Sequence, residues 1–311
     1  MIATVTLNPS LDEWMELPTV RLGQLNRATG FARYPGGKGI NVSRVVRELG
    51  QRTTAYALAG GEDGQMLRRL MDQLAIPHEF VAVSGSTRNN YKIHTQHPRH
   101  PTEINTPGPM VSATALQTLK RRVMNHRPRP RVVALCGSLP PGASVFLYAQ
   151  WIHTLRQRRI PTVLDTSGAA LRRGLTARPW LIKPNRQEAE ELLARRLTTM
   201  RTIVRSAVDL LAQGPALVVL SLGREGAVLA AAPGHVWLAR PPAVHVRSAV
   251  GAGDSLVGGF LVGWLGGRSL VECFRLGVAC GAASALTSGT ELCHRKDVRR
   301  LLSRVTIRRL I

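Results

Sequence analysis

The four residues from Gly251 to Asp254 place a carboxylate at the end of a short glycine turn, within "VGAGDS". The surrounding residues are typical of a strand end, a tight turn and a helix start. Gly251, Ala252 and Gly253 can expose consecutive backbone N–H groups at a helix N-terminus, where the dipole also favours anions. A carboxylate there can accept the proton of an attacking hydroxyl while the amides stabilise a phosphoryl group in transfer. A glycine turn in which Asp254 is only a first-turn helix acid would look the same.

A second glycine turn, "YPGGKGIN", precedes an amphipathic stretch. Gly36, Gly37 and Gly39 allow the backbone to approach a ligand closely. Lys38 adds positive charge for an anionic substrate, and Asn41 could hydrogen-bond sugar hydroxyls. The turn is not a P-loop, because the pattern G-x-x-x-x-G-K-[ST] is absent. A turn that only starts a helix explains these residues equally well.

A third motif, "KPNRQE", sets Asn185 and Glu188 three residues apart on the same side of a predicted helix start. Together they could hold a hydrated Mg²⁺ that bridges nucleotide phosphates, because Mg²⁺ usually keeps several of its waters. Asn185 as N-cap with Glu188 three residues later is also a capping-box pattern. The two roles are compatible.

A fourth candidate is Asp12 in "TLNPSLDEW", which follows the first predicted strand. Ligands bind beyond the carboxyl ends of strands in open α/β sheets. A carboxylate at this point could accept hydrogen bonds from two sugar hydroxyls. An ordinary turn or cap aspartate is the simpler alternative.

The elements that must position these residues alternate between short apolar runs and helical patterns. In "INVSRVVRELG", Val42, Val45, Val46 and Leu49 have helical spacing, and Gly50 stands where a C-terminal cap belongs. The alternation predicts an α/β fold, a doubly wound and mostly parallel sheet with helices on both faces. The predicted strands are 3–7, 54–58, 131–135, 162–165 and 216–220.

Two stretches, at about 13–34 and 89–106, do not fit this alternation. Both could form short antiparallel strands outside the main sheet, and together they would make a small β lid. The chain is otherwise expected to be a single domain over residues 1–311, a length that suits one large α/β domain.

The composition limits the classes of partner. The formal net charge is +23, and only five of the 42 Lys and Arg residues are lysine. Because the basic residues are spread along the chain, nucleic-acid binding is not expected as the main role, although a positive field favours anionic substrates. The carboxylate of Asp254 argues against a membrane span in the apolar run around it. No signal peptide is predicted, so the expected location is cytoplasmic.

Taken in this order, "GGKGIN", "KPNRQE" and "VGAGDS" make the chain resemble the PfkB-type carbohydrate kinases of the ribokinase-like superfamily over essentially its whole length. The resemblance implies a ribokinase-like fold, ATP and Mg²⁺ as cofactors, and a β lid that forms a homodimer clasp. It implies that Asp254 is the base that deprotonates the acceptor hydroxyl, and that Gly251, Ala252 and Gly253 form the anion hole.

The resemblance also implies two groups of binding residues. The phosphosugar would be held by Asp12, Gly37, Lys38, Asn41 and Ser138, with Arg27 and Arg88 on its phosphate because planar arginine suits that group. Asn185 and Glu188 would position Mg²⁺–ATP, with Lys183, Ser221, Gly223, Gly226 and Ser248 lining the nucleotide site.

The substrate is less sharply indicated. "TVTLNPSLD", "GSLPPG" and "PWLIKPNRQE" are similar to the 1-phosphofructokinase branch, which implies phosphorylation of fructose 1-phosphate to fructose 1,6-bisphosphate. "SGTELC" is more similar to a 6-phosphofructokinase branch, and "TEIN" with the following "GP" also resembles tagatose-6-phosphate kinases. A sugar-phosphate sensor without catalysis is a more distant alternative, against which the intact Asp254 argues.

Overall fold

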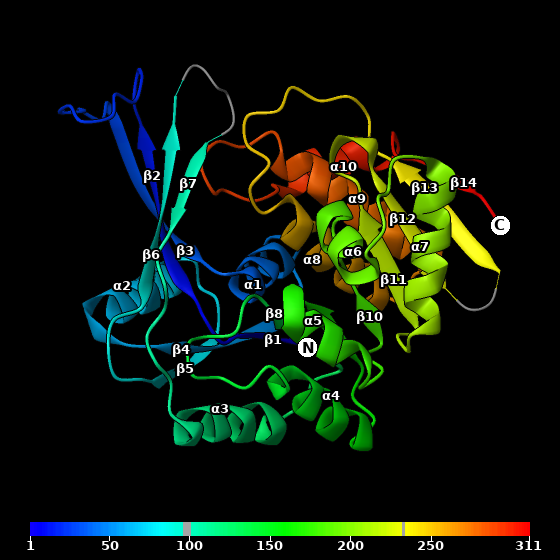
Figure 1. Cartoon of the computed structure of the whole chain (residues 1–311), viewed down its shortest axis with the longest axis horizontal. Coiled ribbons are helices and arrows are strands. Elements are labelled where there is room, and N and C mark those ends of the chain that lie inside the picture. The colour runs from blue at the N-terminus through cyan, green and yellow to red at the C-terminus, as the bar shows by residue number, and fades with distance from the viewer. Residues whose placement is uncertain (96–100, 232–233) are drawn as a thin grey trace.

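The computed structural model describes residues 1–95, 101–231 and 234–311, and these form one large sheet, a small sheet and surrounding helices (Figure 1). In this described part the large sheet has ten strands, and its strands from β5 to β11 run parallel. In sheet order these are β5 (His78–Ala82), β4 (Thr53–Ala59), β1 (Ile2–Thr6), β8 (Val132–Cys136), β9 (Thr162–Asp165), β10 (Leu181–Ile182) and β11 (Leu217–Ser221). An antiparallel edge follows, made of β12 (Ala227–Ala231), β13 (His235–Arg240) and β14 (Thr306–Arg309).

Helices cover both faces of this sheet, as the alternation of apolar residues predicts. Within β1, Ala3 and Val5 pack into one apolar cluster and Ile2 into another, because successive side chains point to opposite faces. The first cluster is shared with α3 (Ala113–Asn125), α4 (Leu147–Gln157), α5 (Gly168–Leu175), α6 (Arg186–Leu193) and α7 (Met200–Ala212). The second is shared with α1 (Lys38–Glu48), α8 (Ala252–Leu265), α9 (Leu270–Ser284) and α10 (Arg295–Leu302). A third cluster holds α2 (Gly61–Gln73) against β4. The predicted fold class is confirmed.

Helix α8 is apolar on all sides because it lies between α1 and α9. A Cβ at Gly258 would come within 2.6 Å of Val45, and one at Gly259 within 2.5 Å of Cys280. Glycine at these two positions therefore lets the three helices approach closely. Within the described residues, no helix is long and apolar enough to cross a membrane.

The small sheet stands beside the large one and is built from two separate parts of the chain (Figure 1). Its order is β3 (Gly30–Gly36), β2 (Ser10–Glu16), β6 (Arg88–His94) and β7 (Thr102–Asn105). Strand β2 pairs antiparallel with β3 and parallel with β6. Residues 96–100 of the second predicted lid stretch lie outside the described residues. The sheet begins where β1 ends, so its inner end faces the carboxyl edge of the large sheet.

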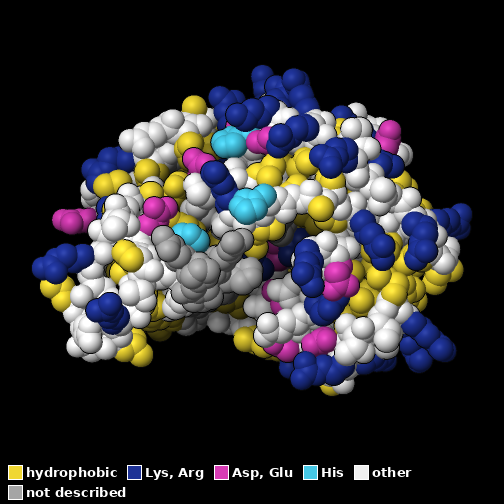
Figure 2. Space-filling model, turned by 90° about the horizontal axis from the view of Figure 1, so that it is seen from above, with side chains coloured by type: hydrophobic (Ala, Val, Ile, Leu, Met, Phe, Trp, Pro, Cys, Tyr) yellow, Lys and Arg dark blue, Asp and Glu magenta, His cyan; other side chains and the backbone are white. Residues whose placement is uncertain are grey.

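Lysine and arginine side chains are scattered over the face seen in Figure 2, on the lid side and on the main body alike. This matches their even spread along the chain. The view also shows a hollow between the lid and the main body.

Candidate active site

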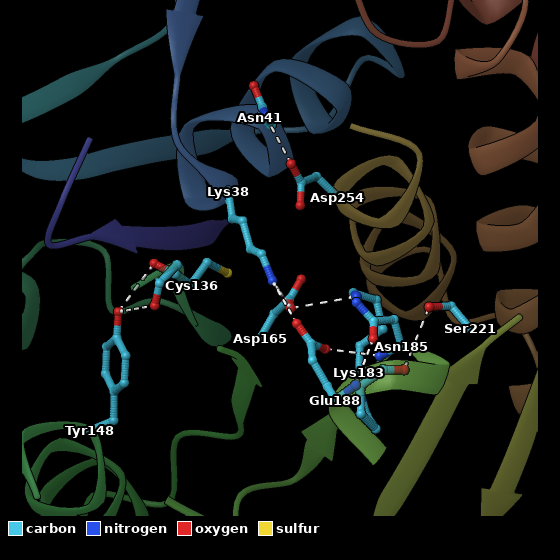
Figure 3. A network of polar contacts seen from close by, with 12 residues as sticks. Lys38, Asn41, Cys136, Tyr148, Asp165, Lys183, Asn185, Glu188, Ser221 and Asp254 are labelled. Carbon is cyan, nitrogen blue, oxygen red and sulfur yellow. Dashed lines mark hydrogen bonds and ion pairs between the residues drawn. The ribbon is translucent and has the colours of Figure 1, made fainter. Parts of the chain in front are cut away.

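Asp254 lies in the first turn of α8, three residues after the left-handed N-cap Gly251 (φ 76°). Its carboxylate is buried and accepts a hydrogen bond from Nδ2 of Asn41 on α1 at 2.8 Å (Figure 3). Burial, reinforced by the nearby Asp165, raises the pKa of Asp254 to about 6, although Lys38, Asn41 and Lys183 oppose the shift. An acid with this pKa can take up and release a proton near neutral pH, which is what a general base requires.

The glycine turn before Asp254 forms the N-terminus of α8, where the first backbone N–H groups have no partner within the helix. Within the turn, the N–H of Ala252 donates a hydrogen bond to the Ala249 carbonyl at 3.3 Å. A Cβ on Gly253 would come within 3.3 Å of the Lys183 Nζ, so this lysine lies against the turn. Backbone N–H groups with a lysine beside them can stabilise developing phosphoryl charge.

A second buried acid, Asp165, lies at the end of β9, and the sequence interpretation missed it. Its Oδ1 is 2.9 Å from Lys38 Nζ and 3.4 Å from Lys183 Nζ (Figure 3). The two lysines hold the pKa of Asp165 below its ordinary value in spite of complete burial. Its other oxygen, Oδ2, has no hydrogen-bond partner within the described residues. An aspartate ending an apolar parallel strand was the available signal, since such strands end at the ligand-binding edge.

Lys38 connects this acid to the predicted nucleotide motif, because its Nζ also lies 3.6 Å from Glu188 Oε1. The capping box at the start of α6 is formed. The Glu188 N–H donates to Asn185 Oδ1 and the Asn185 N–H donates to Glu188 Oε2, both at 2.8 Å. Desolvation favours loss of the Lys38 proton. The negative charges of Asp165 and Glu188 outweigh it, so the pKa of the Lys38 ammonium is raised above its ordinary value. Lys38 therefore stays a cation throughout the physiological range.

Asp12 lies on β2 at the inner end of the small sheet. Its Oδ1 accepts hydrogen bonds from Ser10 Oγ at 2.9 Å and from Asn90 Nδ2 at 3.1 Å. A Cβ on Gly36 would stand 2.3 Å from the same Oδ1, so only glycine fits beside this carboxylate. Gly37, with φ 112°, turns the chain into α1. Asn90 was not predicted, and its place opposite Asp12 on the neighbouring strand comes from a pairing that the sequence does not reveal.

Arg88 begins β6 and is held by the backbone at the end of β1. Its Nε and Nη2 donate to the Asn8 carbonyl at 3.3 and 3.2 Å. The Asn8 side chain donates to Ser138 Oγ at 3.2 Å. Arg88, Asn8 and Ser138 thus form one partly buried group beside Asp12, and Asn8 was missed by sequence reasoning.

Arg27 does not join this group within one chain. It is exposed in the connection that follows the outer end of β2, whereas Arg88 pairs in register with Ser10 at the inner end. Six residues of strand separate the two ends, a span of about 20 Å. The role of Arg27 beside Arg88 on the phosphate stays a prediction.

The remaining predicted nucleotide residues lie after β10, at the end of β11, in the connection from β11 to β12, and in the segment before α8. Ser221 forms a parallel bridge with Asn185, and its hydroxyl donates to the Pro184 carbonyl at 3.5 Å. Gly223 starts a one-turn 3₁₀ helix, and Gly226, with φ 100°, ends it. Ser248 is buried, and its hydroxyl accepts a hydrogen bond from the Val250 N–H at 3.2 Å. Ser221 is thus beside Asn185, as a common nucleotide site requires.

The chain matches the pfkB family of carbohydrate kinases over residues 5–297. It is 35% identical over 306 residues to the 1-phosphofructokinase of Escherichia coli strain K12, covering 98% of this chain and 97% of that protein. It is also 35% identical over 301 residues to the ATP-dependent 6-phosphofructokinase isozyme 2 of Mycobacterium tuberculosis, covering 96% and 88%. The structure of phosphofructokinase-2 from Escherichia coli in complex with substrates and products superposes with a TM-score of 0.92 at 32% identity, covering 97% and 98%.

A buried acid beside a helix N-terminus, flanked by two lysines, on a sheet of this topology defines a phosphotransferase that acts on a sugar hydroxyl. The chain belongs to the pfkB family of carbohydrate kinases. The predicted kinase activity is confirmed at this level, and membership of the family implies ATP as the second substrate.

Proposed function

We propose that this kinase transfers the γ-phosphoryl group of ATP to the C6 hydroxyl of fructose 1-phosphate, giving fructose 1,6-bisphosphate and ADP. The single observation that supports the chemistry is the placement of Asp254. It is buried, raised in pKa to about 6 and held by Asn41 next to the N-terminus of α8. Support for the sugar comes from the whole-length similarity to proteins named 1-phosphofructokinase.

In the proposed reaction, the hydroxyl oxygen of the sugar forms a bond to the γ-phosphorus as Asp254 takes up the hydroxyl proton. The bond from that phosphorus to the β–γ bridging oxygen breaks, and ADP leaves with its electron pair. The backbone donors of Gly251 and Gly253, together with Lys183, would stabilise the charge on the phosphoryl oxygens. Lys38, which lies beside the same Asp165 oxygen as Lys183, would add a further positive charge.

On the sugar side, Asp12 and Asn41 offer polar groups for hydroxyls, and Arg88 with Lys38 offers cations for the phosphate. The Asn8 carbonyl uses only part of the Arg88 guanidinium, because the side chain has five N–H donors and this carbonyl accepts from two of its nitrogens.

A hydrated Mg²⁺ fits the start of α6 better than a directly bound ion does. Asn185 Oδ1 and Glu188 Oε2 are used by the capping box, while Glu188 Oε1 faces the lysine side of the site. No group of three or more His, Cys, Asp or Glu residues that could hold a metal occurs within the described residues. When bound to nucleotide, Mg²⁺ would offset phosphate charge, and we propose that Glu188 contacts it through water.

We further propose that the chain acts as one kinase domain in the cytoplasm and forms a homodimer through its lid. The lid exposes apolar side chains at Leu22, Leu25, Phe31 and Ile104. Phe31 and Ile104 are on strands of the small sheet, and Leu22 and Leu25 are in the connection from β2 to β3. Exposed apolar side chains gathered in this way are typical of a protein interface. Light scattering of the wild-type chain and of a Phe31→Lys, Ile104→Lys double variant tests this. A wild-type chain that is monomeric at enzyme assay concentration would contradict it.

Fructose 6-phosphate is the second candidate substrate. The relative from Mycobacterium tuberculosis is named a 6-phosphofructokinase, and its sequence identity to this chain, 35%, equals that of the 1-phosphofructokinase from Escherichia coli. A coupled ADP-release assay decides between them through kcat/KM for fructose 1-phosphate, fructose 6-phosphate and tagatose 6-phosphate. We expect the highest value for fructose 1-phosphate. A clear preference for fructose 6-phosphate would reject the proposed substrate, and release of no ADP with any of the three would reject this set of acceptors.

A further inference from the structure

Arg44 lies on α1, three residues after Asn41 and on the same side of the helix. Its Nη1 donates two hydrogen bonds, to Asn41 Oδ1 at 3.1 Å and to the Pro35 carbonyl at 3.2 Å. The guanidinium group therefore connects the backbone just before the glycine turn to the side chain that touches the catalytic carboxylate.

The Asn41 amide has one favourable orientation between its two neighbours. Its Oδ1 faces the Arg44 cation, and its Nδ2 faces the Asp254 anion at 2.8 Å. A flipped amide would place oxygen against the carboxylate and an N–H group against the guanidinium, which loses both hydrogen bonds. Without Arg44, Asn41 Oδ1 loses the cation that holds it.

Arg44 is also placed among acids without a direct ion pair within the described residues. Burial lowers the pKa of Arg44 to about 10, while Asp12, Tyr34, Glu291 and Asp254 act to raise it. Arg44 therefore keeps its charge at neutral pH, and it holds Asn41 Oδ1 as a cation.

We propose that Arg44 is a positioning residue for the proposed phosphoryl transfer: by fixing the Asn41 amide, it keeps the Asp254 carboxylate ionised and aligned with the acceptor hydroxyl. Arg44 does not touch the reacting atoms in this account, and its effect is exerted through Asn41. The inference rests on the proposed role of Asp254 as base.

The other charged groups that face Asp254 come from three elements: Lys38 from α1, Asp165 from the end of β9 and Lys183 from the segment after β10. None of these changes when Arg44 is replaced. A change in the pH dependence of an Arg44 variant would therefore report the loss of Arg44 and of the orientation it gives Asn41.

The test is the pH profile of kcat/KM from pH 5 to 9 for Arg44→Met, with Arg47→Met as the matched control. Arg47 is exposed in the last turn of the same helix. A hydrogen bond to a charged group is strong enough to shift a pKa by about one unit. We expect the acid limb of Arg44→Met to move up by about one pH unit, which at pH 6 would reduce kcat/KM about fivefold, because the ionised fraction of Asp254 would fall from about one half to about one tenth. Arg47→Met should keep the wild-type profile.

A double-mutant cycle with Asn41→Ala separates positioning from a general structural effect. Because Arg44 acts through Asn41, Arg44→Met should change the acid limb little once Asn41→Ala is present. Fully additive shifts, or an Arg44→Met enzyme that loses activity without any shift of the limb, would overturn the proposal.

Arg44→Lys supplies a second variant should Arg44→Met fail to fold. A lysine ammonium can replace the single nitrogen that makes both bonds, since it carries three donors. We expect its acid limb within about 0.3 pH units of wild type, well inside the shift that loss of the bond would cause. A folded Arg44→Lys whose limb moves as far as that of Asn41→Ala would overturn the proposal. If no member of this series, Asn41→Ala included, shifted the limb, the assignment of Asp254 as the base would fail instead.

Discussion

Replacing each of the two buried aspartates of the site by asparagine should change the free energy of unfolding in opposite directions. Asp254 has a pKa raised from 3.8 to about 6, so its ionised form is destabilising in the folded protein. The shift corresponds to about 3 kcal/mol at most, at about 1.4 kcal/mol per unit. Asp165 is the counterion of Lys38 and Lys183, and its pKa is lowered. Breaking such a buried pair costs about 3–5 kcal/mol.

We therefore expect Asp254→Asn to raise the free energy of unfolding at pH 8 and Asp165→Asn to lower it. The sign depends on pH in a defined window. In the wild type, the folded state binds the proton of Asp254 more tightly than the unfolded state does. The stability gained from this protonation is fully present below pH 3.8 and is lost as pH rises through 6. The advantage of Asp254→Asn should thus be small near pH 4 and largest above pH 6.

Urea unfolding of the wild type and the two variants at pH 8 and pH 5 provides the measurement, with fluorescence and circular dichroism required to agree at each midpoint. The two single substitutions control for each other, because both remove one buried carboxylate of the same size. The reasoning would be refuted if Asp254→Asn were destabilising at pH 8 by as much as Asp165→Asn.

Three further outcomes are expected from the site. The kcat/KM of the wild type should fall below a midpoint near pH 6, because protonated Asp254 cannot act as a base; a flat profile from pH 5 to 8 would exclude it. Arg88→Ala should raise the KM for the phosphosugar about 10- to 100-fold with kcat little changed, measured by steady-state kinetics, and an unchanged KM would remove Arg88 from the phosphate site. Gly36→Ala should impair phosphosugar binding at least tenfold in calorimetry, because the new Cβ would stand 2.3 Å from Asp12 Oδ1; Gly266→Ala, where the nearest atoms lie at 3.4 Å, should bind normally.

The parts of this site that follow local sequence rules could be predicted from the sequence. The glycine turn before Asp254 and the capping box of Asn185 and Glu188 are set by residues within a few positions of each other. The alternation of apolar strands and amphipathic helices likewise predicts a doubly wound sheet, because its periodicities are local.

The residues that were missed depend on pairing between distant segments. Asn90 reaches Asp12 because β2 and β6 pair in parallel, and Asn8 holds Arg88 from 80 positions away. Asp165 is paired with lysines that come from α1 and from the end of β10.

The proton-accepting role of Asp254 is the central claim, and turnover by Asp254→Ala tests it most directly. A correctly placed base contributes about 10²–10⁴-fold to rate. We predict that the folded variant binds the phosphosugar within a few-fold of wild type by calorimetry but loses at least about a hundredfold in kcat. A folded Asp254→Ala protein with near-normal kcat in the ADP-release assay would contradict the account.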